Sequence, residues 1–448
     1  MKRLCIWCVA WVAVAHAPAE ASTLRVPWDY STLHAALDVA VAGDTVLVGP
    51  GTYSIYEKRL VPSGNWINAL AFLKTGVAVL SEAGPSATII HHYDPSGDVG
   101  FYGFGQSEVL VEGFTFTGNG TGPSLSFGFG GTCVIRGCVF ENIGSGGPQG
   151  AIGGVMSDLE IYDCTFRSIH GNTSPGIFVT SCTLRIEDSE FEDISPGAVR
   201  CWYDDGWVHP ISLEIRRCRF VDVGGSGSAV STLAAAPASL YPVVIEDSWF
   251  ERCINSGTGP GAVRMTSSEP QETRVIRDCT FAGNHNAGTG SSGAVQLSTG
   301  AAGSPVLVEG CTFFGNSVAL PWPEGGAAIL VSSGPAILSH NIFAANTGVA
   351  AVGVRSEANA MTTCNVFWAN PEGHAVGFTL DSTDLIADPE FCNATANDFT
   401  VQSSSPCLPE NSPACTALIG AWPSGCGAVS VESKSWGRIK ADYRSKGE

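Results

Sequence analysis

A phenylalanine recurs ten times in this chain at intervals of 24 to 32 residues, and each time it ends a short run of alternating apolar residues. The ten positions are Phe116, Phe140, Phe166, Phe191, Phe220, Phe250, Phe281, Phe313, Phe343 and Phe367. Alternation with a period of two indicates a strand rather than a helix. Repetition at this spacing is typical of a solenoid, in which each unit buries its apolar face against its neighbours. The sequence therefore predicts an all-β stack of parallel coils.

Two further columns of residues follow the same repeat. Small or polar residues stand two positions before the Phe, at Cys138, Cys164, Ser189, Cys218, Ser248, Cys279, Cys311, Asn341 and Asn365. Asparagines stand three positions after it, at Asn119, Asn284, Asn316, Asn346 and Asn370. In coils stacked at about 4.8 Å, equivalent side chains lie over one another, and stacked amides can hydrogen-bond along the column. We therefore interpret both columns as structural.

A second strand, written Gly-Ala-Val or similar, follows most of the Phe strands, as at 197–199, 261–263 and 293–295. Each coil thus has at least two strands, with room for a third. Residues 54–380 are expected to form these coils. Residues 22–53 read as strand, helix, strand, with Ser31 or Thr32 capping the helix and Gly43 ending it, and are expected to form an N-terminal cap.

The ends of the chain have their own composition. Residues 1–21 carry a basic start, an apolar stretch and a small-residue cleavage site, which together predict a signal peptide and export to the cell surface or the medium. Residues 381–427 are rich in Pro, Ser and Cys and are expected to form a C-terminal cap, and residues 428–448 form a basic tail. No later segment is long and apolar enough to span a membrane.

Cysteines fall into two groups. Those in the repeat column are expected to be buried thiols, because stacked parallel strands rarely give disulfide geometry. In an exported protein, Cys392, Cys407, Cys415 and Cys426 are disulfide candidates, with Cys364 as a possible odd member. Their pairing stays open, and a zinc site is the rival interpretation.

The formal net charge is −19. An acidic surface repels nucleic acid and anionic membranes, so neither is an expected partner. It would also repel an acidic polysaccharide unless divalent cations bridge the two. We expect a monomer.

Two segments carry a resemblance to a known family. Residues 26–53 contain VPWDYSTLHAA followed by GDTVLVGPGTY, and a closing segment runs from Asp388-Pro389-Glu390-Phe391 to Ile419-Gly420-Ala421. With the repeats and their asparagines, these resemble the pectin-lyase-like superfamily. That resemblance implies a right-handed parallel β-helix. It leaves the chemistry open, because the superfamily includes lyases, hydrolases, epimerases and non-catalytic surface proteins.

The family's enzymes suggest where to look for chemistry. Lyases of the pectate-lyase type bind calcium through acidic residues and use an arginine as base. The Asn-Thr-Asp and Gly-His-Gly motifs of the family's hydrolases are absent, and Arg438-Ile439-Lys440 lies in the tail. Calcium is thus the one cofactor that the resemblance suggests.

The stretch 200–209 stands out because it departs from the repeat and concentrates aromatic, acidic and basic residues. Together with the same strand column in later coils, it supplies the candidate catalytic residues Arg200, Asp204, Asp205 and Arg264. The candidate substrate-binding residues are Trp202, Tyr203, Trp207, His209 and Gln296. Aromatic faces stack on sugar rings, and carboxylates bind hydroxyls or calcium or act as acid and base. The alternative is a loop whose tryptophans cover the flank of the helix and whose Asp204-Asp205-Gly206 forms an ordinary turn.

These observations favour a secreted or cell-surface protein that engages polysaccharide along the flank of the helix. One alternative is a calcium-dependent polysaccharide lyase or a glycoside hydrolase. The other is a structural or adhesive surface module without a small substrate.

Overall fold

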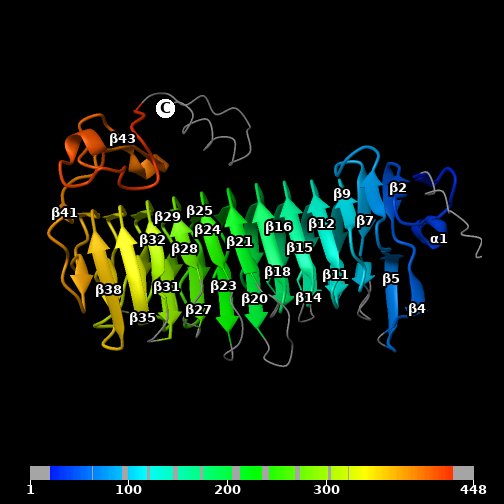
Figure 1. The fold of residues 1–448 in the computed structure, drawn as a ribbon, viewed down its shortest axis with the longest axis horizontal. Helices are drawn as coiled ribbons and strands as arrows, with labels where there is room; N and C mark the ends of the chain where they lie inside the picture. The colour runs from blue at the N-terminus through cyan, green and yellow to red at the C-terminus, as the bar shows by residue number, and fades with distance from the viewer. Residues whose placement is uncertain are drawn as a thin grey trace, which may run out of the picture.

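The computed structural model describes residues 21–62, 64–92, 99–118, 122–144, 150–171, 175–203, 212–234, 242–267, 273–300, 304–320 and 322–426. These residues form a long stack of coils, with the helix α1 (Leu33–Val39) at one end (Figure 1). Each regular coil supplies one strand to each of three parallel sheets. The predicted fold class, an all-β parallel β-helix, is confirmed.

The first sheet, called here the charged sheet, contains the strands that precede each Phe strand. Its strands are β1 (Thr23–Val26), β2 (Thr45–Val48), β6 (Ala78–Ser81), β9 (Val109–Glu112), β12 (Thr132–Arg136), β15 (Asp158–Tyr162), β18 (Thr183–Glu187), β21 (Ser212–Arg216), β24 (Val243–Glu246), β28 (Arg274–Arg277), β32 (Val306–Glu309), β35 (Ile329–Ser339) and β38 (Ala358–Thr363).

The second sheet, the Phe sheet, carries the recurring phenylalanines. Its strands are β3 (Gly51–Tyr53), β7 (Thr88–His91), β10 (Thr115–Gly118), β13 (Val139–Ile143), β16 (Thr165–His170), β19 (Glu190–Ser195), β22 (Arg219–Val221), β25 (Trp249–Glu251), β29 (Thr280–Ala282), β33 (Thr312–Phe314), β36 (Ile342–Ala344), β39 (Val366–Trp368) and β41 (Leu385–Ile386).

The third sheet, the GAV sheet, contains the Gly-Ala-Val strands and shares the long β35 with the charged sheet. Its other strands are β4 (Glu57–Leu60), β5 (Trp66–Phe72), β8 (Val99–Phe104), β11 (Leu125–Gly128), β14 (Ile152–Val155), β17 (Ile177–Thr180), β20 (Val199–Tyr203), β23 (Val230–Ala234), β27 (Val263–Ser267), β31 (Val295–Thr299), β37 (Val352–Val354) and β40 (Ala375–Val376). A small additional sheet follows the Phe strands of three coils, in β26 (Ile254–Asn255), β30 (His285–Asn286) and β34 (Ser317–Val318).

The ten phenylalanines form one continuous stack inside the helix. Neighbouring rings from Phe116 to Phe367 lie 4.6 to 5.1 Å apart, with interplanar angles of 1 to 18°. Each is at most 1% exposed. The strands pair so that Phe lies opposite Phe in every coil of this run. The stack therefore confirms the predicted register.

We predicted that the run of residues ending at each Phe forms a single strand. In the structure this run forms two strands, one in the charged sheet and one in the Phe sheet. The residue three positions before the Phe has φ between +52 and +80°, in the left-handed region, and turns the chain from the charged sheet into the Phe sheet. These residues are Gly113, Gly137, Asp163, Asp188, Arg217, Asp247, Asp278, Gly310, His340 and Cys364. The apolar alternation continues through the bend, and this continuity hides the bend in the sequence.

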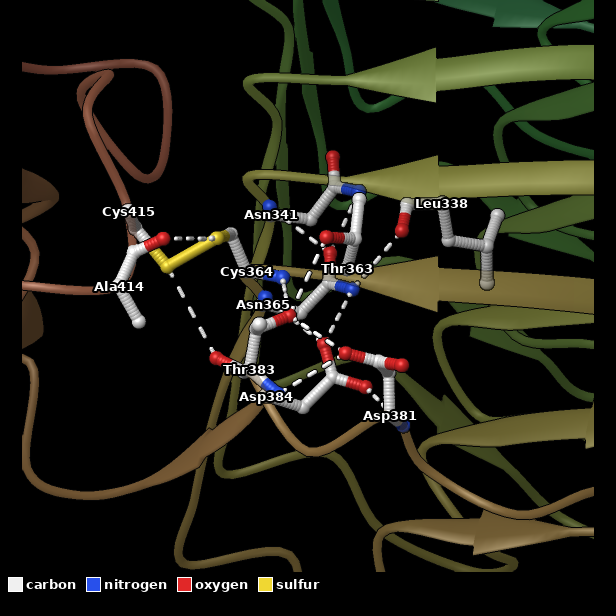
Figure 2. The surroundings of a disulfide bond; sticks show 10 residues. All are labelled: Leu338, Asn341, Thr363, Cys364, Asn365, Asp381, Thr383, Asp384, Ala414 and Cys415. Atoms are coloured by element: carbon white, nitrogen blue, oxygen red, sulfur yellow. Dashed lines mark hydrogen bonds between the residues drawn. A yellow bond between two sulfur atoms is a disulfide. The ribbon is translucent and has the colours of Figure 1, made fainter.

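The two polar columns form ladders at the bends. Asn284, Asn316, Asn346 and Asn370 are hydrogen-bonded in series, each side-chain Oδ1 accepting from the amide of the preceding Asn at 3.0 to 3.1 Å. The second ladder runs from Asn341 through Asn365 to Asp384, as Figure 2 shows. Both interpretations of the columns as structural are confirmed for the described residues. Asn119 lies outside them.

At the N-terminal end, Thr32 caps α1, and its Oγ1 accepts a hydrogen bond from the Ala35 amide at 3.2 Å. The helix ends at Val39 rather than at the predicted Gly43, because Ala40 already has an extended ψ of 142°. Gly43, with φ +96°, instead lies in the turn that leads into β2. The buried side of α1 covers the first coil through Leu33 and Leu37.

At the other end, Phe378 and Leu380 pack against the core, and β41 closes the Phe sheet. The chain then turns back, and residues 391–426 lie along the outer face of the Phe sheet (Figure 1). Their hairpin, β42 (Phe391–Asn393) and β43 (Asp398–Val401), is antiparallel. The Trp422 indole packs against Trp249 and donates to Thr280 Oγ1 at 2.8 Å.

Two disulfides tie this segment down, Cys364–Cys415 (Figure 2) and Cys392–Cys426. We expected Cys364 to be the odd cysteine, but it is disulfide-bonded. The unpaired cysteine of this group is instead Cys407, which is a buried free thiol. The repeat-column cysteines are also free and buried, as predicted.

Parts of the prediction concern residues that the structure does not describe. These are most of the signal peptide and the basic tail. Within the described ranges, no helix is long and apolar enough to cross a membrane.

Candidate functional site

The candidate residues on the GAV strands lie in one row across neighbouring coils. Arg200 of β20 pairs with Ser231 of β23, which pairs with Arg264 of β27, which pairs with Gln296 of β31. Adjacent residues of a strand point to opposite faces. Since Val199 and Cys201 lie in the core, Arg200 stands on the outer face of the GAV sheet. The sheet therefore brings together three of the predicted site residues.

Arg200 is half-buried on this face, because the loop of the next coil lies over its guanidinium group. A Cβ built on Gly227 would lie 3.2 Å from Nη2 of Arg200. Burial lowers the pKa of Arg200 below its ordinary value, since desolvation disfavours the charged form. No described carboxylate forms an ion pair with it.

Arg264 has a similar environment one coil further along. Its Nε is buried without a hydrogen-bond partner, and its Cδ lies 3.7 Å from where a Cβ on Gly259 would stand. No described carboxylate pairs with Arg264 either. Two strand spacings separate the rows of Arg200 and Arg264, which places their backbones roughly 10 Å apart. The outer GAV face thus holds two half-buried cations whose charge the described residues leave uncompensated.

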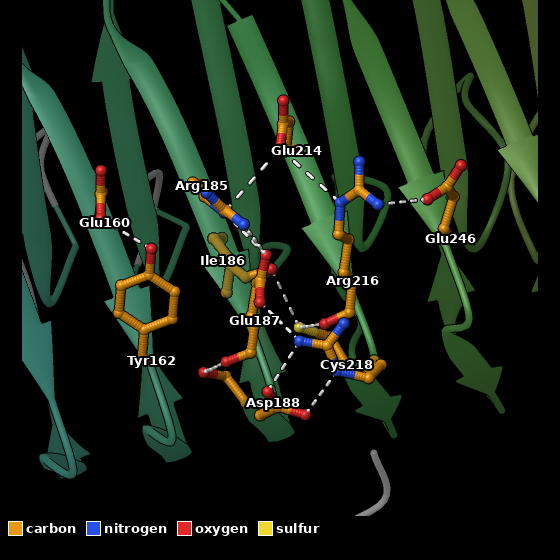
Figure 3. A network of polar contacts seen from close by, with 12 residues as sticks. Glu160, Tyr162, Arg185, Ile186, Glu187, Asp188, Glu214, Arg216, Cys218 and Glu246 are labelled. Carbon is orange, nitrogen blue, oxygen red and sulfur yellow. Dashed lines mark hydrogen bonds and ion pairs between the residues drawn. The ribbon is translucent and has the colours of Figure 1, made fainter. Parts of the chain in front are cut away.

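The charged sheet shows the opposite arrangement. There Arg136, Arg185, Arg216 and Arg277 each form an ion pair with a carboxylate of their own or a neighbouring strand. Figure 3 shows the centre of this network, in which Glu187 accepts a hydrogen bond from Arg185. Glu187 also accepts a hydrogen bond from Arg217. Burial alone would raise the pKa of Glu187, but the hydrogen bonds from the two arginines outweigh it and lower the pKa. On the described part of this face, each of these four arginines therefore has a carboxylate partner.

Trp202 lies two positions after Arg200 and on the same face, with 44% of its surface exposed. It pairs with Thr180 in the preceding coil and Leu233 in the next. Gln296 is half-buried, and its Nε2 lies 3.5 Å from Ser332 Oγ, a weak contact that leaves hydrogen-bonding capacity. An indole face, an amide and two guanidinium groups therefore share one surface.

The remaining predicted site residues are not placed by the structure. Asp204, Asp205, Trp207 and His209 lie outside the described residues, and Tyr203 ends β20 with its side chain undescribed. Among the described residues, no group of three or more His, Cys, Asp or Glu side chains is arranged to hold a metal ion. The described residues thus show no acidic cluster of the kind that binds calcium in lyases of the pectate-lyase type.

Sequence reasoning missed an aromatic cluster on the same outer face, near the N-terminal end of the GAV sheet. It comprises Phe72, Tyr102, Phe104 and Phe129, with neighbouring ring centroids 4.6 to 6.2 Å apart. The available signal was the alternation of aromatic residues with glycine in Tyr102-Gly103-Phe104-Gly105 and Phe127-Gly128-Phe129-Gly130. This alternation resembles the core pattern, but the strand register places Tyr102 and Phe104 outside.

No protein-family model matches the chain, and no curated protein matches it. Among solved structures, the surface adhesin PfbA of Streptococcus pneumoniae is similar, with 11% identity over 82% of this chain and 95% of that chain and a TM-score of 0.43. Pectate lyase Pel9A is 14% identical over 91% of this chain and 97% of its own, with a TM-score of 0.34. The alginate lyase AlyGC of family PL6 is 11% identical over 92% of this chain and 60% of its own, with a TM-score of 0.43. Likenesses at this level carry no argument about function, and the β-helix fold rests on the strand register described above.

Proposed function

We propose that this protein is exported and binds an acidic polysaccharide along the outer face of the GAV sheet. The observation that carries the proposal is the pair Arg200 and Arg264, half-buried on one face without a described carboxylate partner. A partly buried cation is stabilised by an opposite charge, and a guanidinium group binds a carboxylate through two parallel hydrogen bonds. Carboxylates repeated along a sugar chain would supply such charges to both arginines.

The neighbouring side chains suit a sugar chain. Trp202 offers an aromatic face against which a sugar ring can stack, and Gln296 offers an amide for hydroxyl groups. The net charge of −19 opposes long-range approach of a polyanion, so binding would rest on these local cations. Export is supported by the sequence of residues 1–21 and by two disulfides, which persist in oxidising compartments.

The test measures binding of protein comprising residues 22–448 to polygalacturonate, alginate and neutral dextran. Arg264→Gln and Arg200→Gln should each weaken binding to the acidic polymers about tenfold, since each removes a charge-assisted contact. Arg136→Gln is the matched control, because Arg136 is a half-exposed arginine on the charged sheet. Equal affinity of all three variants and the unaltered protein, or preference for dextran, would refute the proposal.

A second candidate function, polysaccharide lyase, is favoured by the position of Arg200, which lies half-buried beneath the loop that carries Gly227. Burial lowers the pKa of Arg200, which increases the small fraction of neutral guanidine available as a base. In this version neutral Arg200 takes the proton next to a uronate carboxylate, and Arg264 stabilises the negative charge that develops on that carboxylate. The electron pair left behind forms a C=C bond as the glycosidic C–O bond β to the carboxylate breaks, and the departing sugar oxygen takes a proton from water. Formation of unsaturated uronate, followed by absorbance with calcium and with chelator, tests it. Activity that survives Arg200→Gln would rule out this role for Arg200.

A further inference from the structure

The aromatic cluster of Phe72, Tyr102, Phe104 and Phe129, called here the aromatic platform, lies outside the core on the GAV sheet. The Phe104 and Phe129 rings are 4.6 Å apart, and the Tyr102 and Phe104 rings are 6.2 Å apart and nearly parallel, at 12°. Phe129 is 43% exposed. A single exposed aromatic side chain needs no explanation, but a contiguous group of them marks an interaction surface.

The backbone at Phe129 brings its ring onto this surface. Phe129 has φ +58°, in the left-handed region. The equivalent positions in neighbouring coils, Gly105, Met156 and Ser181, also have φ between +49 and +66°, because Phe104, Gly128, Val155 and Thr180 pair in one row. The left-handed turn is therefore a regular feature of these coils, and at Phe129 it carries a partly exposed aromatic ring.

A glycine beside the rings makes the platform flat. A Cβ built on Gly128 would lie 3.2 Å from Cδ2 of Phe104, closer than ordinary van der Waals contact. The absence of a side chain at 128 therefore lets the Phe104 ring lie over β11. A flat, half-exposed aromatic surface matches the apolar face of a sugar ring.

The platform is continuous with the arginine site through the strand register. Tyr102 pairs with Ser126, and the same row continues through Gly153 and Phe178 to Arg200. Four strand spacings separate Tyr102 from Arg200, which amounts to about 19 Å along the helix axis. Phe104 and Trp202 are likewise four coils apart in the adjacent outer row.

We infer that the aromatic platform is a second binding region for the same glycan, stacking on sugar rings while Arg200 and Arg264 hold carboxylates further along the chain. This inference rests on the proposed function and adds a requirement for length. Only a polymer that extends over both regions uses all of the site. The ligand is therefore a long acidic polysaccharide rather than a short oligosaccharide.

The experiment compares long-chain polygalacturonate and alginate with digalacturonate on unaltered protein (residues 22–448) and on Phe129→Gly. Glycine removes the ring and also relieves the left-handed backbone, so the variant should fold at least as well, as thermal unfolding can verify. Affinity for the polymer should fall about fivefold, as expected for one aromatic contact, whereas affinity for digalacturonate should not change. Trp368→Ala is the control, because Trp368 is 40% exposed but lies on β39 of the Phe sheet.

The outcomes separate the two proposals. Unchanged polymer affinity in Phe129→Gly, together with weakened binding in Arg264→Gln, overturns the inference and leaves the proposed function standing. An equal loss for polymer and digalacturonate overturns the length requirement. Failure of both polymers to bind the unaltered protein overturns the proposed function and the inference together.

Discussion

Replacing Asn316 with Ala should destabilise the helix by an amount that can be worked out from its ladder contacts. Oδ1 of Asn316 accepts from the backbone and side-chain amides of Asn284, both at 3.0 Å. Without it, one buried N–H of the Asn284 backbone and one of its side chain lose their partner, while Asn346 Oδ1 keeps the bond from the residue 316 backbone. At about 1–3 kcal/mol for each orphaned buried donor, the expected loss is about 2–6 kcal/mol.

The assay is urea unfolding followed by circular dichroism, with Asn359→Ala as the control. Asn359 is an exposed asparagine on β38, so its replacement should change the free energy of unfolding by less than about 0.5 kcal/mol. A loss below about 1 kcal/mol for Asn316→Ala would show that the ladder does not satisfy buried amides in the way described.

Three further outcomes follow from the structure. The pKa of Glu187 is lowered in the folded state, so ionised Glu187 stabilises the fold above its unfolded pKa of about 4.3, and this stabilisation is lost as the pH falls through the lower folded pKa. Between about pH 6 and pH 3, the Glu187→Gln variant should therefore lose less stability than the unaltered protein, as thermal unfolding scans can measure. Cys415→Ser opens a disulfide that closes a 51-residue separation, and should cost roughly 4 kcal/mol by the loop-entropy relation, whereas Cys407→Ser, at a free thiol, should keep both disulfides by mass spectrometry. Trp422→Ala should make residues 391–426 sensitive to limited proteolysis, because Trp422 is buried against the Phe sheet, whereas Trp368→Ala should not.

Much of the fold was predictable because side chains in a stack repeat with the coil. Phe116 to Phe367, the asparagine ladder and the Gly-Ala-Val strands all follow from residues that recur at one place in the unit. The bend before each Phe was not predictable, because residues as different as Asp163, Arg217 and Cys364 adopt the same left-handed conformation there. The disulfide pairing depends on how the C-terminal segment turns back, which no local pattern encodes.

The site was predictable only in part, because the repeat gives the face on which a residue lies but not its contacts with neighbouring coils. The shared face of Arg200, Arg264 and Gln296 follows from their common position after Gly-Ala-Val, and the register confirms it. The sequence could not show that no carboxylate among the described residues pairs with these arginines, since that depends on side chains from neighbouring coils. The sequence also could not show that Phe101 lies in the core whereas Phe104 lies on the outer face of the GAV sheet. Both belong to one aromatic segment, and the register of β8 decides which of its residues point into the core.

Hydroxyl-radical footprinting of the protein with and without bound polygalacturonate or alginate tests most directly whether the outer GAV face binds the polymer. The bound polymer should slow oxidation of Trp202, Tyr102 and Phe129 on the outer GAV face. Trp368 on the Phe sheet and Trp28 near α1, both exposed, should oxidise at unchanged rates. Protection of Trp368 with none at Trp202 would show that the ligand binds another face of the helix and would refute the proposed site.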